Sequence, residues 1–224
     1  MSLAALVSAL ALAQTAAPLD VGTLVVRIDT QEVARETFRL LTRRLGDNTS
    51  GWVLATTARW VVGPRPAVLA PVLELAPDSE PAVLVYEVAA NGVSLRIIGQ
   101  RGLGRYTLRY VSPGRERARE LAAAPPTVMV DDSVFAPYLF AAWRAGATPT
   151  AVTGIFPRVA LRVPLTIIDL GLAGTTLNRD STTLRHMLVT GGPDGPVHVW
   201  LGTDGRLMKI EVPERSIRAE RLPG

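Results

Sequence analysis

The feature that most constrains this chain is an alternation of apolar and polar residues that continues over most of its length. In the stretch from Trp52 to Val62, WVLATTARWVV, every second side chain would lie on one face of a strand. Pairs such as Asn91-Gly92 and Pro113-Gly114 separate the runs and are typical of tight turns. About ten strands joined by such turns predict a mainly β protein with a single antiparallel sheet. We expect this sheet to curve into a half-barrel or open barrel, because large sheets twist.

The later strands are less evenly spaced. The segment RERARELAAAPP at 115–126 fits either a short strand or a helical turn. Beyond it, further strands are expected at VALRVPLTIIDL (159–170), TTLNRDSTTLRHMLVT (175–190), PVHVWLGT (196–203) and GRLMKIEVP (205–213).

Residues 131–146, DDSVFAPYLFAAWRAG, interrupt the alternation with a largely apolar run. Its aromatic side chains recur at helical spacing, and they are Phe135, Tyr138, Phe140 and Trp143. The residues at 131–133 are typical of a helix N-cap, Pro137 suits a first turn, and Gly146 suits a stop. We therefore predict one α-helix from 136 to 145, buried as a plug across the concave side of the sheet.

The first residues, MSLAALVSALALA at 1–13, are small and apolar. Ala11 and Ala13 fit a signal-peptidase site, with cleavage before Gln14. No Lys or Arg precedes this run, which leaves a buried or frayed N-terminal helix as the alternative. Once the signal is removed, we expect a single antiparallel β domain over 19–224 with a central helix. Because no second apolar run is long enough to span a membrane, this predicts a soluble periplasmic or secreted protein.

The composition excludes several kinds of site. The chain contains no cysteine, so it has no disulfide, zinc–thiolate site, iron–sulfur cluster or lipoprotein-type lipid anchor. Its formal net charge is +4, and Lys209 is the one lysine among 24 basic residues. The arginines are spread singly instead of forming a stripe that could follow a phosphate backbone. We therefore expect no nucleic-acid partner.

The two histidines, His186 and His198, are the first candidates for chemistry. A hairpin closed by the GGPDG turn at 191–195 would place His186 opposite Trp200. It would also place His198 opposite Leu188, on the same face of the sheet.

Continuing the pairing through the TDG turn at 203–205, with a one-residue bulge, adds Met208 and Ile210 to the histidine face. These apolar companions predict that the face is the core side. The histidines would then be core residues bonded to a carbonyl or hydroxyl, or line a ligand pocket, or bind a metal. We expect no metal site, because a third ligand at suitable spacing is not visible.

Three further motifs have ordinary structural interpretations. Asp131 and Asp132 could form an acid–base pair, but adjacent carboxylates at a helix start are more often caps. Ser133 lies beside them without a G-x-S-x-G elbow, and no histidine is placed next to it by the sequence. The glycine-rich GQRGLG at 99–104 does not sit between a strand and a helix, so it is interpreted as a turn. No cofactor is expected.

Three parts of the chain together resemble a known group. They are the signal-like start with the strands that follow it, DDSVFAPYLFAAW in the middle, and the closing VHVWLGTDGRLMKIEVP. The set resembles uncharacterised bacterial exported proteins whose fold is similar to the half-barrel of the periplasmic lipoprotein carriers. The resemblance implies a curved sheet closed by helices and a function in carrying a hydrophobic ligand or in envelope assembly.

Our leading functional expectation is an exported, soluble carrier of a hydrophobic or amphipathic, lipid-like molecule held between sheet and helix. The expected lining residues are Trp52, Trp60, Phe135, Tyr138, Trp143, His186, His198 and Trp200. A first alternative is a non-enzymatic envelope scaffold or interaction protein with a solid core. A second is an enzyme that acts on an apolar intermediate enclosed by the half-barrel.

Overall fold

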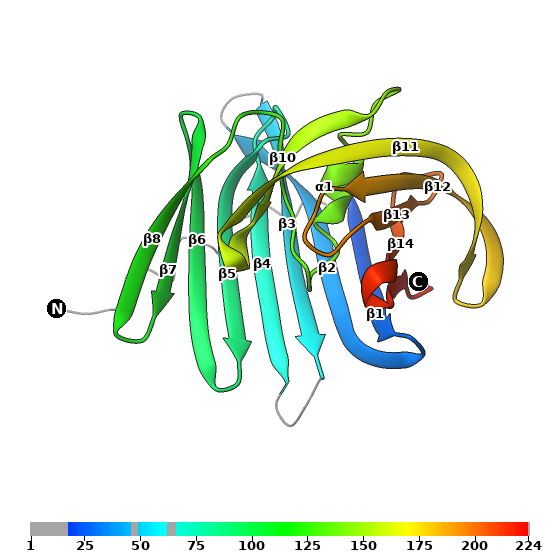
Figure 1. Cartoon of the computed structure of the whole chain (residues 1–224), viewed down its shortest axis with the longest axis horizontal. Helices are drawn as coiled ribbons and strands as arrows, with labels where there is room; N and C mark the ends of the chain where they lie inside the picture. Colours follow the sequence, from blue (N-terminus) through cyan, green and yellow to red (C-terminus); the bar gives the residue numbers. More distant parts are fainter. Residues whose placement is uncertain (1–17, 46–48, 62–65, 224) are drawn as a thin grey trace.

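Fifteen strands form one sheet in the computed structural model, which describes residues 18–45, 49–61 and 66–223 (Figure 1). The expected signal peptide at 1–13 and its cleavage site before Gln14 lie outside the described residues. The first eight strands are β1 (Asp20–Ile28), β2 (Gln31–Leu45), β3 (Thr49–Trp60), β4 (Ala67–Leu75), β5 (Pro81–Ala90), β6 (Val93–Gly102), β7 (Arg105–Ser112) and β8 (Arg115–Ala122). The others are β9 (Thr127–Met129), β10 (Thr150–Phe156), β11 (Leu161–Leu177), β12 (Asp180–Thr190), β13 (Val197–Leu201), β14 (Leu207–Val212) and β15 (Ile217–Arg221).

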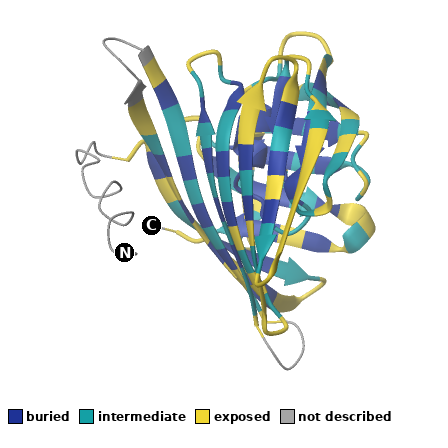
Figure 2. Ribbon diagram, turned by 90° about the vertical axis from the view of Figure 1, so that its left-hand side faces the viewer, coloured by how far each residue is buried: buried dark blue, intermediate teal, exposed yellow. Residues whose placement is uncertain are grey.

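The sheet consists of two arms that meet at the first and last strands. Strands β1 to β8 lie side by side in chain order, and β15 back to β9 continue on the other side of β1. The pairs are antiparallel except that of β9 with β10. The sheet curls round without closing, and β8 and β9 are its two edge strands (Figures 1 and 2). This confirms a large, mostly antiparallel, curved sheet, although fifteen strands exceed the ten predicted.

Three of the additional strands, β9, β10 and β15, lie in segments where no strand was predicted, and the turn between β11 and β12 was misplaced. The ambiguous segment at 115–126 begins with β8. Asn178 and Arg179 both have positive φ, 50° and 77°, and form the turn between β11 and β12. Strand β11 therefore runs on to Leu177, and Gly171, with φ of 77°, lies at a register shift within the β11–β12 pairing. In contrast, Asn91 and Gly92 form the expected turn between β5 and β6.

The predicted helix is much shorter than 136–145. The α-helix α1 covers Tyr138–Ala142, and its N-cap is Pro137 without any side-chain cap bond. Two further short helical turns are η2 (Pro157–Val159) and η3 (Pro213–Arg215). The N–H groups of Arg144 and Ala145 donate to carbonyls three residues earlier, so α1 ends in a tighter turn. The residues at 131–133 do not cap α1, because their side chains are bound elsewhere.

The core lies on one face of the sheet, which we call the inner face. Buried side chains on this face include Leu24, Phe38, Leu54 and Tyr86, and they pack in one cluster with apolar residues of the segment 128–142. We call residues 130–145 the plug, because they lie against the inner face and all five residues of α1 are buried. Within the described ranges, none of the helices has the length and apolar character needed to cross a bilayer.

Candidate functional site

The plug begins with two backbone N–H groups that meet a carboxylate from a distant strand. Glu36 on β2 is fully buried on the inner face, between Ala34 and Phe38 in the alternation. Its two carboxylate oxygens accept hydrogen bonds of 2.7 Å each from the N–H groups of Phe135 and Ala136. Burial raises the pKa of Glu36 to about 7, although these two bonds act in the opposite direction. Glu36 thus binds the N–H groups just before α1, as an N-cap residue would.

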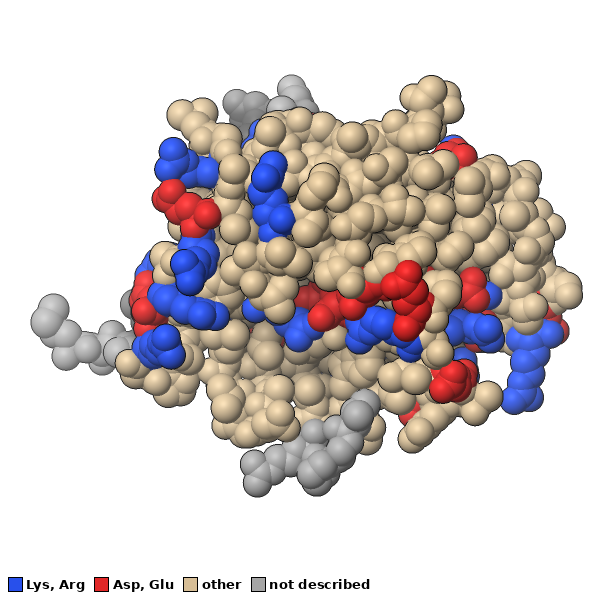
Figure 3. Space-filling view, viewed as in Figure 1, with Lys and Arg blue, Asp and Glu red and all other residues tan. Residues whose placement is uncertain are grey.

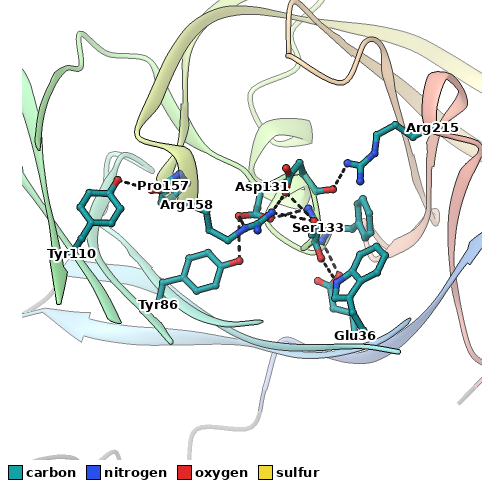
Figure 4. Close-up of polar contacts among 11 residues, drawn as sticks. Glu36, Tyr86, Tyr110, Asp131, Ser133, Pro157, Arg158 and Arg215 are labelled. Carbon is teal, nitrogen blue, oxygen red and sulfur yellow. Dashed lines mark hydrogen bonds and ion pairs between the residues drawn. The ribbon is translucent and has the colours of Figure 1, made fainter. Parts of the chain in front are cut away.

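Asp131 and Arg158 form a second fastening of the plug (Figure 4). Arg158 Nε lies 2.9 Å from a carboxylate oxygen of Asp131, whose side chain is buried. The same carboxylate accepts hydrogen bonds from the Tyr86 hydroxyl at 3.1 Å and from the Ser133 N–H at 2.8 Å. Burial raises the pKa of Asp131, and the charge of Arg158 acts against that rise. This carboxylate is therefore fully engaged by donors.

Other side chains bind the plug backbone or the turn beside it. Trp60 Nε1 donates to the Ser133 carbonyl at 2.9 Å, and the Tyr110 hydroxyl donates to the Pro157 carbonyl at 2.6 Å. Arg158 also contacts Asp132, and Arg215 donates to the carbonyl of that residue at 2.5 Å. We call Glu36, Trp60, Tyr86, Asp131 and Arg158 the clamp.

The far end of the plug is tied by another buried carboxylate. Glu80 accepts a hydrogen bond from Arg144 Nη2 at 2.7 Å and another from the Thr127 N–H at 2.9 Å. Arg144 Nη2 also donates to the Ser79 carbonyl at 2.5 Å. Both ends of the plug are therefore attached to the β1–β8 arm, at β2 and directly before β5, by charged groups that lie mostly out of water.

This arrangement suits fastening better than catalysis. Asp131 and Asp132 share Arg158 as a partner, and Glu36 is occupied by backbone donors. A shallow, open hollow of about 450 Å³ lies instead near the end of the β11–β12 hairpin, where Gly174, Thr175, Thr176, Ser181, Thr182 and Thr183 line it. Among the described residues, no group of three or more His, Asp or Glu side chains is arranged to hold a metal ion.

Five of the eight expected lining residues meet on the inner face. Trp60 and Phe135 have ring centroids 6.4 Å apart, and Trp52 lies edge-on to Trp143 at 5.7 Å. Tyr138 lies in α1 and is buried with the plug. Trp143 itself is 38% exposed, so the expectation of a fully buried aromatic stripe is wrong at this position. The early end of α1 explains the difference, because Trp143 follows its last residue at the rim of the plug.

The remaining three lie on the opposite, outer face. The predicted pairing of His186 with Trp200, and of Leu188 with His198, is confirmed. The continuation to Met208 and Ile210 is wrong, because Lys209 lies opposite Trp200. The register shift lies within the strand pair, between Trp200 and Leu201, instead of at the TDG turn, and a one-residue slip exchanges the faces of a strand.

The outer-face residues form a compact polar and aromatic group. His186 stacks on Trp200, with centroids 3.8 Å apart and planes at 3°. The His186 Nε2 and His198 Nδ1 atoms are 2.8 Å apart, so the histidines bond to each other instead of to a carbonyl or hydroxyl. Burial and the neighbouring His198 lower the pKa of His186. Trp200 Nε1 donates to Glu211 at 3.1 Å. We call His186, His198, Trp200, Lys209 and Glu211 the outer cluster.

The end of the β11–β12 hairpin covers the outer cluster. Lys209, only 2% exposed, donates from Nζ to Thr175 Oγ1 at 3.0 Å and to the Thr176 carbonyl at 2.8 Å. It also forms an ion pair of 2.9 Å with Glu211. Asn178, in the hairpin turn, donates to the Arg221 carbonyl at 2.8 Å. The one lysine of the described chain thus joins the hairpin to the outer face of the sheet.

Comparison with known proteins bears on the fold. No family model matches the chain, and no curated protein matches it. A crystal structure of a β-barrel-like protein of the domain of unknown function DUF1849, from Brucella abortus, is similar in structure, with a TM-score of 0.53. The two chains are 9% identical, over 90% of this chain and 93% of that one.

The chain shares its fold with that protein. At such low identity the similarity extends to the fold alone. It does not identify a lipoprotein carrier, so the carrier part of the expected resemblance stays a prediction.

Sequence reasoning missed several of the residues that hold the plug. Glu36 carried a detectable signal, because it is a charged residue on the apolar side of the alternation formed by Ala34, Phe38 and Leu40. Arg158 and Glu80 carried none, since both lie near turns where arginine and glutamate are commonly solvated. Their partners are 27 and 47 residues away in sequence, a separation that only folding brings together.

Proposed function

We propose that the protein is a non-enzymatic interaction protein of the cell envelope, built as a rigid curved sheet with a filled interior. The observation that carries this proposal is the plug, because the chain's own residues occupy the inner face and are fastened there by the clamp. Charged groups that are buried and mutually paired are costly to separate, which favours a permanent plug over a mobile lid.

The edge of the sheet supplies the surface for interaction. Strand β8 is eight residues long, and its residues are exposed apart from partly exposed Leu121. It pairs with β7 on one side, and on the other side no strand of the described ranges pairs with it. An unpaired edge strand presents backbone donors and acceptors that can accommodate a further strand.

A photo-crosslinking experiment tests this proposal. A photoreactive residue at Ala118, in the middle of β8, is expected to give one defined protein adduct in the host envelope. The same residue at Leu172, which is 69% exposed on β11, is the matched control and is expected to give none. Equal labelling from both positions, or labelling from neither, would contradict the proposal.

Export remains part of the proposal and has its own test. The apolar run at 1–13 supports secretion to the periplasm or beyond. Fractionation of host cells, with N-terminal sequencing of the mature protein, is expected to find the chain outside the cytoplasm and beginning at Gln14. A full-length chain recovered from the cytoplasm would contradict export.

A specific observation also favours the carrier as a second candidate. Trp52, Phe140 and Trp143 form an edge-to-face aromatic group at the end of the plug, and Trp143 reaches the surface. Such a group can bind an apolar chain at the rim without displacing the clamp. Lipid extraction and mass spectrometry of protein purified from its host would show a stoichiometric lipid that is lost in Trp143→Ala. Protein free of lipid would exclude the carrier and leave the first proposal intact.

A further inference from the structure

The two faces of edge strand β8 differ in charge. On the outer face, Glu116 is paired with Arg109 at 2.6 Å and Glu120 with Arg105 at 2.8 Å, both from β7. On the inner face, the side chains in order are Arg115, Arg117 and Arg119, whose partners across the ladder are Ser112, Tyr110 and Leu108. Within the described part of the chain, none of these three arginines forms an ion pair. One face of the edge is neutralised and the other carries three unpaired positive charges.

The middle arginine of this row, Arg117, is held in place by an aromatic ring. The Arg117 guanidinium lies 4.7 Å above the centroid of the Tyr110 ring, which is buried and donates its hydroxyl hydrogen bond to Pro157. The stacking leaves the guanidinium hydrogens free for an acceptor at the edge. Charged side chains are gathered along the left edge of the molecule, where β7 and β8 lie (Figure 3).

We propose that β8 binds an extended, acidic segment of a partner protein as an additional strand, with carboxylates at every second position opposite the three arginines. This rests on the proposed interaction function and names the partner's chemistry. Side chains on one face of a strand repeat every second residue, about 6.6 Å, so only an extended chain matches both the arginine row and the backbone edge.

The same row discriminates against other occupants. Inward-facing charges on an edge strand prevent pairing with apolar strands, and these arginines would also repel basic ones. A second copy of β8 would bring one arginine row against another, so self-association through this edge is disfavoured. An acidic strand is instead attracted, because its carboxylates can form ion pairs with the three arginines.

The first test uses a labelled ten-residue peptide of alternating Thr and Glu, with binding to the whole protein followed by fluorescence anisotropy. The triple variant R115Q/R117Q/R119Q is expected to bind this peptide at least about tenfold more weakly, from three exposed ion pairs. The matched control R105Q/R109Q, on the opposite face of the same hairpin, is expected to change binding less than about twofold. Thermal unfolding checks that both variants are folded.

Peptide variants separate strand pairing from simple charge attraction. A peptide with five Thr followed by five Glu has the same composition but the wrong spacing, and it is expected to bind weakly. Methylation of every second backbone nitrogen along one edge of the alternating peptide is expected to abolish binding, because it removes the ladder donors. Equal binding of all three peptides would overturn the proposal.

Anionic lipid is the competing partner and is tested directly. Vesicles containing phosphatidylglycerol that bind through the same three arginines, while the alternating peptide does not, would overturn the acidic-strand proposal. If the peptide fails while crosslinking at Ala118 still gives a defined protein adduct, the interaction function stands and its acidic chemistry is wrong. If both fail, the interaction function fails with it.

Discussion

The inner clamp and the outer cluster are both polar networks on the same sheet, yet they are built differently. The clamp joins the plug to residues between 27 and 100 positions away in sequence, the longest separation being that of Glu36 from Ala136. Most of the outer cluster comes from neighbouring strands, as the pairing of His186 with Trp200 shows. Glu36 is fully buried, whereas the Glu211 side chain is 24% exposed. We infer that the clamp determines whether the interior stays filled and that the outer cluster determines how firmly the hairpin is attached.

The largest expected effect lies within the plug. Replacing Phe135, which is 1% exposed, with Ala is expected to lower the free energy of unfolding by about 4 kcal/mol, because it leaves a cavity in a packed core. Trp143→Ala, at a residue 38% exposed, is the control and is expected to cost about 1–2 kcal/mol. Urea denaturation measures both. Similar losses would mean that the rim of the plug is packed as tightly as its centre.

Breaking the ion pair of the clamp should cost somewhat less. Arg158→Ala leaves the Asp131 carboxylate buried without its cation and is expected to cost about 3 kcal/mol. The double variant Arg158→Ala with Asp131→Asn is expected to recover part of this loss, since it removes the unpaired charge. A double-mutant cycle from chemical denaturation gives the coupling. Additive effects would show that the pair does not fasten the plug.

The pH dependence of stability tests the burial of Glu36. Its pKa is about 7 in the folded protein against 4.5 for an ordinary glutamate, so the folded state holds the extra proton between these values. The contribution of Glu36 to stability is therefore greatest below about pH 4.5 and falls as pH rises towards 7, by up to about 3 kcal/mol.

The isosteric variant Glu36→Gln removes this titration. It is expected to lose the fall between pH 5 and about pH 7 while being less stable at low pH, because an amide offers one acceptor to the two N–H donors. Glu87→Gln, at an exposed pair with Arg96, is the control and is expected to keep the wild-type slope. An unchanged slope in Glu36→Gln would assign the pH dependence to another group.

The outer cluster should respond more weakly. Lys209→Met keeps the length of the buried side chain but removes its bonds to Thr175, Thr176 and Glu211. We expect a loss of about 1 kcal/mol, because Glu211 is partly solvated and keeps Arg218 at 3.4 Å. Amide hydrogen exchange should rise in the β11–β12 hairpin and not in the plug. Faster exchange in the plug would show that the two networks are coupled.

The smallest effect is expected from the histidines. The pKa of His186 is lowered below 6.5, so the unfolded state binds more protons and stability falls as pH decreases from 6.5. This sign is opposite to that of Glu36, and His186→Gln should remove it. Comparing the double variant Glu36→Gln/His186→Gln with the single variant Glu36→Gln isolates the pH dependence that comes from His186. A slope that is unchanged by His186→Gln would mean that the histidine pair does not report on folding.

The sequence predicted the features that depend on neighbouring residues. The alternation indicated a large antiparallel sheet, Asn91-Gly92 indicated a hairpin, and the pairing of His186 with Trp200 followed from one short turn. The prediction from sequence failed where a turn could be placed at more than one position. The β11–β12 turn at Asn178 and Arg179 and the β13–β14 register shift were misplaced, and with them the face that carries the histidines.

The candidate site was predictable only in part. The aromatic residues of the plug were found because their spacing is a local pattern. Phe135, Tyr138 and Phe140 are buried, whereas Trp143 is 38% exposed. The assignment of 131–133 as caps was wrong. Asp131 binds Tyr86 and Arg158 instead, and neither partner lies near it in sequence.

By itself, the sequence determined that the chain forms a curved antiparallel sheet with an aromatic segment buried against it, because strand periodicity and apolar burial are local properties. Only the tertiary structure decided which carboxylates lose water, which arginine compensates them, and which face carries the histidines. Those outcomes depend on contacts between distant residues and on single-residue shifts in register, and such contacts leave no fixed spacing in the sequence.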